Sequence, residues 1–321
     1  MTRIAVASRS FARNPALRIE LAEKYPDVTF SESPRVLEGA ALVKLLRGHD
    51  RAIVGLERID ERVLAELPEL KVISKYGVGL DGLDLAALER HGVKLAWAGG
   101  INRRSVAELT LAFAIALMHR IPETSVGLRD GDFRPLVGRQ LTGRVVGIIG
   151  CGFVGKDLVT LLAPFGCRVM AHDIRDYPEF YAAHGVEPVS RDRLLADADI
   201  VTLHVPLDES TRGMIGAAEL ARMRKGACLI NAARGGLVDE AALVDALARG
   251  HLAGAACDVF QTEPEANPEL LALPTFLGTP HIGGSTAEAQ LAMGRAAIAG
   301  LEHAQLLGPT HPALGGQEEP R

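Results

Sequence analysis

Short apolar runs alternate with helix-like segments along most of the chain. We interpret four runs in its first part as strands, at 4–7, 52–54, 72–74 and 94–97. The segments between them, such as 60–67 and 84–90, have helical character, and Gly92 follows the second of these. This alternation predicts a parallel sheet with helices on both faces.

A second and stronger series of apolar runs begins at residue 144. Its members are 144–149, 168–171, 199–203, 227–230 and 253–257. Continuous apolar runs suit strands that are buried on both faces of a sheet. A helix is expected over 239–249, because acids stand at its start, Arg249 lies in its last turn and Gly250 follows. The second series therefore predicts a second parallel sheet.

Two longer helical stretches connect these series. We expect 102–119 to bridge the two sheets and about 285–307 to return to the first. The prediction is an α/β fold of two Rossmann-like, doubly wound parallel-sheet domains. The domain at 100–284 is inserted in a domain made of 1–99 and 285–307. Residues 308–321 are rich in Gly, Pro and Glu, so a disordered tail is expected there.

Composition excludes several classes of protein. The 321 residues suit two domains, at about 100–200 residues each. Lys+Arg 35 against Asp+Glu 40 gives a net charge of -5, too mild to indicate nucleic acid or an anionic membrane as partner. No apolar stretch approaches the roughly 20 residues of a membrane helix. The start of the chain lacks the apolar core of a secretory signal.

The four cysteines, at 151, 167, 228 and 257, form no CxxC pair. Their neighbours are apolar or Gly, which favours buried free thiols in a reducing compartment over disulfides or a zinc site. We therefore expect a cytoplasmic protein without a metal.

A glycine-rich motif, GCGFVG at 150–155, follows the strand that ends at residue 149 and precedes a helix-like run at 156–162. Gly150 permits a tight turn. Gly152 lets the backbone approach a pyrophosphate at the helix N-terminus, and Gly155 lets helix and strand pack closely. Glycines in this pattern are weak evidence alone, but the strand before them and the helix after them fit a dinucleotide site.

An acid stands at the end of the next predicted strand. Asp173 lies 23 positions after Gly150, and dinucleotide sites have an acid about 20 residues on that binds the ribose hydroxyl. A carboxylate there repels a 2′-phosphate, so NAD is favoured over NADP, although Arg175 could soften that repulsion. The alternative is a glycine turn with an ordinary surface Asp.

Three later segments, 231–239, 258–264 and 279–286, each lie near a predicted strand end, where doubly wound sheets bind ligands. Arg234 could bind a carboxylate with its planar guanidinium. Glu263 precedes a proline. His281 stands before two glycines and can exchange a proton near neutral pH. Each of these residues, taken alone, could be an ordinary surface or structural residue.

Together these segments resemble the D-2-hydroxyacid dehydrogenase family, and most closely its D-3-phosphoglycerate dehydrogenase branch in the short form without a regulatory domain. The matching motifs lie at 76–81, 104–109, 150–155, 204–207, 231–239, 258–264 and 280–286. They span the chain from about residue 51 to about residue 300. Feedback by serine through an appended regulatory domain is therefore not expected.

The resemblance implies a role for each residue of the site. Arg234 would bind the carboxylate and carbonyl of a 2-oxoacid, His281 would be the general acid/base, and Glu263 would orient His281 and favour its protonated form. The implied substrate-binding residues are Tyr76, Val78, Gly79, Asn102, Arg234 and His281, and the backbone around Val78 and Gly79 would hold the substrate carboxylate. The implied cofactor-binding residues are Val78, Gly150, Gly152, Phe153, Val154, Gly155, Asp173, His204, Val205, Pro206, Thr211, Ala232, Ala233, Arg234, Asp258, His281, Gly283 and Gly284.

The implied activity is hydride transfer between NAD and C2 of a D-2-hydroxyacid or its 2-oxoacid. The first candidate pair is 3-phosphoglycerate and 3-phosphohydroxypyruvate. The branch commonly has an Arg-Ser pair after the strand at 51–55, whereas Leu56-Glu57 stands here. Hydroxypyruvate, glyoxylate or another anionic 2-oxoacid is therefore the second candidate. The cations available for a distal anion are Arg58, Lys75, Arg103 and Arg104.

Two further alternatives are weaker. Formate dehydrogenases resemble this fold but carry Gln where Glu263 stands. A NAD(H)-sensing interaction protein of the corepressor type can keep the same three residues, although its added interaction segments are not evident here. The resemblance also implies a homodimer, with the region around 102–119 and the following segment near the interface.

Overall fold

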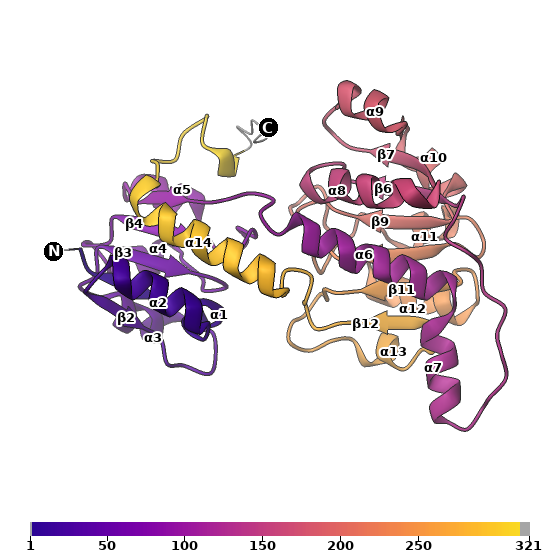
Figure 1. Cartoon of the computed structure of the whole chain (residues 1–321), viewed down its shortest axis with the longest axis horizontal. Coiled ribbons are helices and arrows are strands. Elements are labelled where there is room, and N and C mark those ends of the chain that lie inside the picture. Colours follow the sequence, from indigo (N-terminus) through magenta and orange to yellow (C-terminus); the bar gives the residue numbers. More distant parts are fainter. Residues whose placement is uncertain (1, 315–321) are drawn as a thin grey trace. The chain divides into compact units, whose positions relative to one another are not determined.

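Within residues 2–314, the part of the chain that the computed structural model describes, the paired strands form two parallel sheets (Figure 1). The described residues up to Asn102 and those from Thr286 onward make a first compact unit. Arg103–Ser285 make a second unit, inserted in the first. Each unit contains one sheet, the first sheet and the second sheet respectively. This arrangement confirms the predicted α/β fold with two parallel-sheet domains.

The first sheet has the strand order β2-β1-β3-β4-β5. The order reverses between β1 and β3: the chain runs from β1 to β2 towards one edge of the sheet, and from β3 to β4 towards the other. The elements of the first unit are β1 (Ile4–Val6), α1 (Arg9–Ala12), α2 (Pro15–Lys24), β2 (Val28–Phe30), α3 (Gly39–Leu46), β3 (Arg51–Val54), α4 (Glu61–Ala65), β4 (Val72–Lys75), α5 (Leu85–Arg90), β5 (Lys94–Ala96) and α14 (Ala287–His303).

Helices bury both faces of the first sheet. On one face, side chains of α3, α4 and α5 join a cluster that includes Leu42, Leu64 and Leu88. On the other, α1, α2 and α14 contribute a cluster that includes Phe11 and Leu301. The helix that follows the second unit thus returns to the first, as predicted, and packs on β3, β4 and β5.

The second sheet has the order β12-β11-β10-β9-β6-β7-β8 and reverses between β6 and β9. The first two helices of the second unit precede its first strand. Its elements are α6 (Arg103–Met118), α7 (Ile121–Arg129), β6 (Val145–Ile149), α8 (Phe153–Leu162), β7 (Arg168–His172), α9 (Pro178–His184), β8 (Glu187–Pro188), α10 (Arg191–Asp197), β9 (Ile200–Leu203), α11 (Ala217–Arg222), β10 (Cys228–Asn231), α12 (Glu240–Ala248), β11 (Gly254–Cys257), α13 (Pro268–Leu271) and β12 (Phe276–Gly278).

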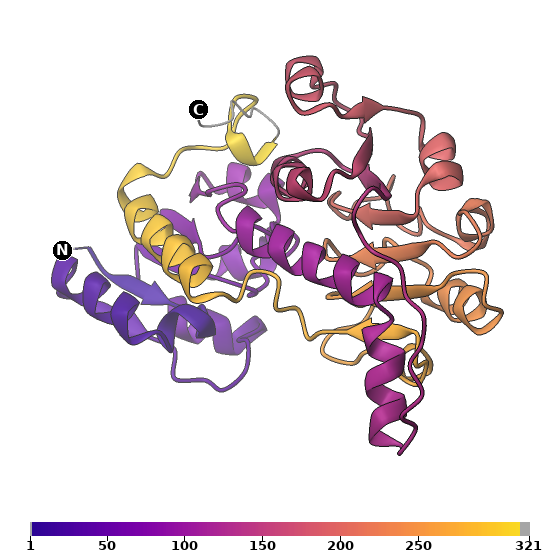
Figure 2. The same cartoon turned by 45° about the vertical axis from the view of Figure 1, so that its right-hand side comes forward.

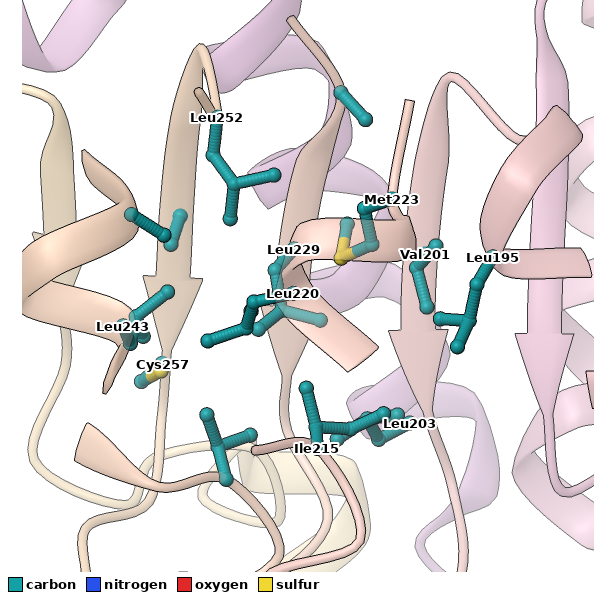
Figure 3. Packing of buried hydrophobic residues seen from close by; sticks show 14 of the residues in the cluster. Leu195, Val201, Leu203, Ile215, Leu220, Met223, Leu229, Leu243, Leu252 and Cys257 are labelled. Carbon is teal, nitrogen blue, oxygen red and sulfur yellow. The ribbon is translucent and has the colours of Figure 1, made fainter. Parts of the chain in front are cut away.

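The second sheet is also covered on both faces. Helices α10 to α13 lie on one face, where Leu195, Leu220 and Leu243 pack against Val201 and Leu229 of the strands (Figure 3). Helices α6, α8 and α9 cover the other face. Burial on both sides explains why these strands are continuously apolar.

Three strands, β2, β8 and β12, were not expected from the sequence. Each has at most three residues and lies at an edge of its sheet. Edge strands this short bury too few side chains to produce a clear apolar pattern.

The expected disorder of 308–321 is wrong for 308–314. Pro312–Leu314 form a 3-10 turn, and buried His311 pairs through Nε2 with the carbonyl oxygen of Leu95 at 3.1 Å. Gly and Pro in this segment therefore make a fixed turn, which a buried polar contact holds in place. The rest of the expected tail lies outside the described residues.

No single helix among residues 2–314 is long and apolar enough to cross a membrane; α6 and α7 meet the criteria only together, with a bend of 65° between them.

Candidate active site

The predicted dinucleotide turn joins β6 to α8 at the place where the second sheet reverses its order. Gly150 has φ +94°, and a side chain there would lie 2.7 Å from the carbonyl of His204, after β9. A side chain at Gly155 would lie 2.4 Å from the carbonyl oxygen of Gly150. Only glycine fits at either position, so α8 approaches the strand closely.

The space beside this turn fits a phosphate group. A Cβ on Gly152 would meet nothing within 4 Å, and α8 begins at Phe153 without a side-chain cap. The first N–H groups of a helix without such a cap are good donors for an anion. The predicted contacts of Phe153 and Val154 with a pyrophosphate would come from these backbone groups.

Asp173 follows β7 directly and is fixed beside the turn. Its Oδ2 accepts the N–H of Cys151 at 2.6 Å, and its Oδ1 accepts the N–H of Arg175 at 2.9 Å. A carboxylate has about four acceptor positions, so each oxygen retains one for a ribose hydroxyl. This donor and acceptor set suits the ribose of NAD, which carries no 2′-phosphate.

His204 lies on the other side of the turn, at the carboxyl end of β9. Its Nε2 lies 3.1 Å from the hydroxyl of Thr202, whereas its buried Nδ1 has no hydrogen-bond partner among the described residues. Burial lowers the pKa of His204 to about 4, so the ring is neutral near pH 7. After it, Thr211 donates to the carbonyl of Pro206 at 2.8 Å and closes the predicted cofactor loop that begins at Val205.

His281 and Glu263 form a hydrogen-bonded pair, with His281 Nδ1 2.8 Å from Glu263 Oε2. The other carboxylate oxygen accepts the N–H of Phe260 at 3.1 Å. The hydrogen bond to Glu263 is the main cause that raises the pKa of His281, and it outweighs burial. Since the carboxylate accepts the Nδ1 proton, Nε2 is the nitrogen left for proton exchange with a substrate.

The pKa of Glu263 moves in the opposite direction. Burial is the largest influence and raises it, but the hydrogen bonds from His281 and the Phe260 N–H together lower this pKa below its usual value. The pair is therefore an ionised carboxylate beside a histidine that holds its proton more firmly than usual.

Buried Asp258 fixes the loop that carries His281. Its Oδ1 accepts from the Thr279 hydroxyl at 2.5 Å and from the Ile282 N–H at 2.7 Å, and its Oδ2 accepts the Gly283 N–H at 2.7 Å. The Asp258 backbone carbonyl also accepts the N–H of His281 at 2.8 Å. Asp258, which the family resemblance implies as a cofactor-binding residue, therefore also holds the loop that carries His281.

Arg234 is placed by a second buried polar residue, Asn231, which the sequence analysis did not single out. Asn231 Nδ2 donates to the carbonyl of Arg234 at 2.9 Å, and its Oδ1 accepts the N–H of Ala233 at 3.1 Å. The residue Asn231 ends β10, so its polar side chain at the end of an apolar strand was the available signal.

Gly235 brings the Arg234 loop against the Glu263 loop. A Cβ on Gly235 would lie 1.7 Å from the carbonyl oxygen of Phe260, so the two backbones touch. The charge of Arg234 accordingly affects both partners of the acid–base pair. It lowers the pKa of Glu263 and opposes the rise in the pKa of His281. The second unit thus brings together all three predicted catalytic residues.

The predicted substrate residues Tyr76, Val78, Gly79 and Asn102 belong to the first unit. Tyr76 packs edge-on against Phe11 at 5.8 Å between ring centroids, with its hydroxyl buried in the core rather than presented at the surface. Burial raises the pKa of Tyr76 to about 12. The carbonyl of Val78 accepts the indole N–H of Trp97 at 2.8 Å, which fixes the glycine-rich loop after β4.

Comparisons with known proteins agree with this geometry. Residues 111–283 match the family described as D-isomer specific 2-hydroxyacid dehydrogenase, NAD binding domain. The D-3-phosphoglycerate dehydrogenase of Mycobacterium tuberculosis is 41% identical over 234 residues, 72% of this chain, but the chain spans only 44% of that protein. The glyoxylate reductase of Thermococcus litoralis is 34% identical over 290 residues, 87% of each chain.

The fold also matches solved structures. A putative D-isomer specific 2-hydroxyacid dehydrogenase from Polaromonas sp. superposes with a TM-score of 0.86 at 29% identity, covering 94% of this chain and 96% of its own. The chain therefore belongs to the D-isomer specific 2-hydroxyacid dehydrogenase family, and its second unit is the family's NAD-binding domain.

Proposed function

We propose that the protein transfers a hydride between NAD and C2 of a D-2-hydroxyacid or its 2-oxoacid. The observation that carries this proposal is the pairing of Glu263 with His281 beside Arg234, on loops that follow strands of the NAD-binding domain. A general acid/base and a guanidinium are the two groups that carbonyl reduction requires from a protein.

Bound NADH would supply the hydride, and the residues of the chain would supply charge and a proton. As the carbonyl carbon is reduced, negative charge develops on its oxygen. Arg234 and protonated His281 stabilise that charge, and His281 then gives its Nε2 proton to the oxygen. In the oxidative direction, neutral His281 removes the hydroxyl proton and Glu263 stabilises the resulting imidazolium.

The similar proteins support two kinds of substrate. The relatives named as phosphoglycerate dehydrogenases favour 3-phosphoglycerate and 3-phosphohydroxypyruvate, and the relatives named as glyoxylate and hydroxypyruvate reductases favour small 2-oxoacids. All of these substrates share a carboxylate next to the reacting carbon. The proposed substrate class is therefore an anionic 2-oxoacid.

Steady-state oxidation of NADH with glyoxylate, hydroxypyruvate and 3-phosphohydroxypyruvate, compared under one set of conditions, tests this function. Turnover of at least one 2-oxoacid is expected. Tight NADH binding without turnover of any 2-oxoacid would contradict the proposal and would favour a NAD(H)-sensing protein.

We further propose that a second copy of this chain covers an apolar arm, residues 121–137, formed by α7 and the loop after it. Helix α7 extends away from the rest of the second unit (Figures 1 and 2). The side chains of Phe133 and Val137 are 88% and 90% exposed in a single chain. Exposed apolar surface of this kind is typical of an interface between subunits.

A cytoplasmic location is also part of the proposal, and the cysteines support it. Cys151, Cys228 and Cys257 are buried, and none of them forms a disulfide with another described residue. Burial raises the pKa of both Cys228 and Cys257 to about 12. Thiols of this kind are common in proteins of reducing compartments.

A further inference from the structure

A buried polar cluster lies at the carboxyl edge of the first sheet, where the strand order reverses between β1 and β3. Ser8 follows β1, Gly55 and Glu57 follow β3, and Lys75 ends β4. All except Gly55 are polar residues that are buried in the first unit. Ligands of doubly wound sheets bind outside the carboxyl ends of strands at such a reversal.

The backbone N–H and the backbone carbonyl of Gly55 are each bound by a side chain, and the two side chains belong to residues of opposite charge type. Glu57 Oε2 accepts the N–H of Gly55 at 2.5 Å, and Lys75 Nζ donates to its carbonyl oxygen at 2.5 Å. Only 1% of Glu57 and 6% of Lys75 is exposed. Burial raises the pKa of Glu57, while the Gly55 N–H and the charges of Lys75 and Arg9 oppose that rise. Buried charges in a protein are normally retained only with such partners.

The ammonium group of Lys75 also lies beneath the glycine-rich loop after β4. Nζ donates to the carbonyl of Tyr76 at 3.3 Å, and a Cβ on Gly77 would lie 3.8 Å from Nζ. Gly77 has φ +105°, a backbone conformation that side chains rarely adopt. A cation therefore lies next to Gly77, at the start of the 77–79 loop, which is expected to bind the substrate carboxylate through its backbone.

We propose that Lys75 is a positioning residue that strengthens binding of the substrate carboxylate to the 77–79 loop, and that Glu57 weakens this effect through its opposite charge. This inference rests on the proposed 2-oxoacid function. Because Lys75 acts through the loop and on the carboxylate, its effect is the same for every 2-oxoacid.

The surroundings of the cluster do not favour a distal phosphate. In the first unit, the side chain of Arg58 is 79% exposed and pairs with Asp60 at 3.4 Å. Leu56 and Glu57 contribute no positive charge, and the Glu57 carboxylate opposes a second anionic group nearby. The residues after β3 therefore favour small 2-oxoacids, such as glyoxylate and hydroxypyruvate, over phosphorylated ones.

The test compares Lys75→Gln and Glu57→Gln in the full chain at about pH 8, well above the ordinary pKa of a carboxyl group, because burial raises the pKa of Glu57. Lys75→Gln should raise KM for glyoxylate and hydroxypyruvate about tenfold, with kcat much less affected. Glu57→Gln should lower KM for both substrates. Lys75→Arg should restore part of the lost affinity, and Arg62→Gln, which removes an exposed cation on α4 of the same unit, should leave KM unchanged.

NADH affinity, measured by fluorescence, should be the same in all four variants, because the NAD-binding domain is the second unit. Equal or higher KM in Glu57→Gln would overturn the proposal, since a merely structural clamp loses function when either partner is removed. The KM of Glu57→Gln therefore tests the proposal even if Lys75→Gln does not fold. An effect of Lys75→Gln confined to 3-phosphohydroxypyruvate would also overturn it. If the unmodified protein turned over no 2-oxoacid, the proposed function itself would fail, and this inference with it.

Discussion

His281 has a backbone conformation that few residues adopt, with φ +54°. Outside glycine, this left-handed region is best tolerated by Asn, Asp and His. His281→Asn should therefore keep the loop on Asp258 while removing the titrating ring. We expect turnover of the best 2-oxoacid to fall about 10²-fold or more, with NADH binding retained. Steady-state kinetics measure this, and near-normal turnover would remove His281 from the mechanism.

The pH dependence of the reaction should follow the charge of Glu263. Because this carboxylate raises the pKa of His281, it extends the protonated form needed for reduction to higher pH. Glu263→Gln keeps a similar shape but removes the charge, so the pKa of His281 should fall. In pH profiles, kcat/KM for reduction should then decline at lower pH than in the unmodified protein. The limb for oxidation, which needs neutral His281, should also move to lower pH; an unmoved profile would contradict the pairing.

Asp173 should determine the choice between NADH and NADPH. Its carboxylate is held beside the dinucleotide turn by the Cys151 and Arg175 N–H groups, where a 2′-phosphate would meet a negative charge. Asp173→Ala should lower kcat/KM with NADH and raise relative use of NADPH, with Arg175 nearby as a cation. The ratio of the two kcat/KM values is the measurement. A ratio equal to that of the unmodified protein would show that Asp173 does not face the ribose.

Among the elements, the loops after β10 and β11 are in direct backbone contact, so neither can move without the other. Gly235→Ala would place a methyl group into the backbone of Phe260, so the Arg234 loop must move away from the Glu263 loop. A displacement of about 1 Å in a catalytic group can cost roughly 10²-fold in rate. We expect kcat/KM to fall by about that factor. Gly226→Ala, in the same domain, is the control for glycine substitution: its φ is +78°, but it has open space around it.

The two glycine variants separate two explanations. Gly226→Ala carries the strain of a positive φ alone, so it should lower the melting temperature and leave kcat/KM nearly unchanged. If Gly235→Ala also left kcat/KM nearly unchanged, the position of Arg234 would not depend on contact between the two loops.

These elements show what a sequence can and cannot predict. Apolar periodicity located the central strands, and the glycine motif located the β6–α8 turn, because both depend on neighbours along the chain. The contact between Gly235 and Phe260 depends on β10 and β11 lying side by side, which no local pattern encodes. For the same reason, no local pattern showed that Asp258 holds the His281 loop.

At the scale of the whole molecule, strand order was the property that the sequence could not supply. The β–α alternation is the same in both units, yet the strand orders differ. The order is β2-β1-β3-β4-β5 in the first sheet and β12-β11-β10-β9-β6-β7-β8 in the second. Both sheets nevertheless bring two loops together where the strand order reverses. In the first unit this reversal places Gly55, after β3, against Ser8, after β1, and in the second it places Gly150 against His204.

The assembly of the molecule should depend on the apolar arm. The chain that follows the arm is attached to the second unit by Arg139, which donates to the carbonyl of Gly226 at 2.6 Å. The arm therefore has a fixed attachment, whereas its side chains Phe133 and Val137 are exposed. If these side chains are buried by a second copy, Phe133→Asp with Val137→Asp should convert a dimer to a monomer, because two charges cannot be buried unpaired at an interface.

Light scattering coupled to size exclusion measures this change in mass. Ile19→Asp is the matched control, because Ile19 is an exposed apolar residue of α2 in the first unit and should leave the mass unchanged. A double variant with the mass of the unmodified protein would show that the subunits do not associate through the arm. A monomer from both the control and the double variant would show instead that association is sensitive to any added charge.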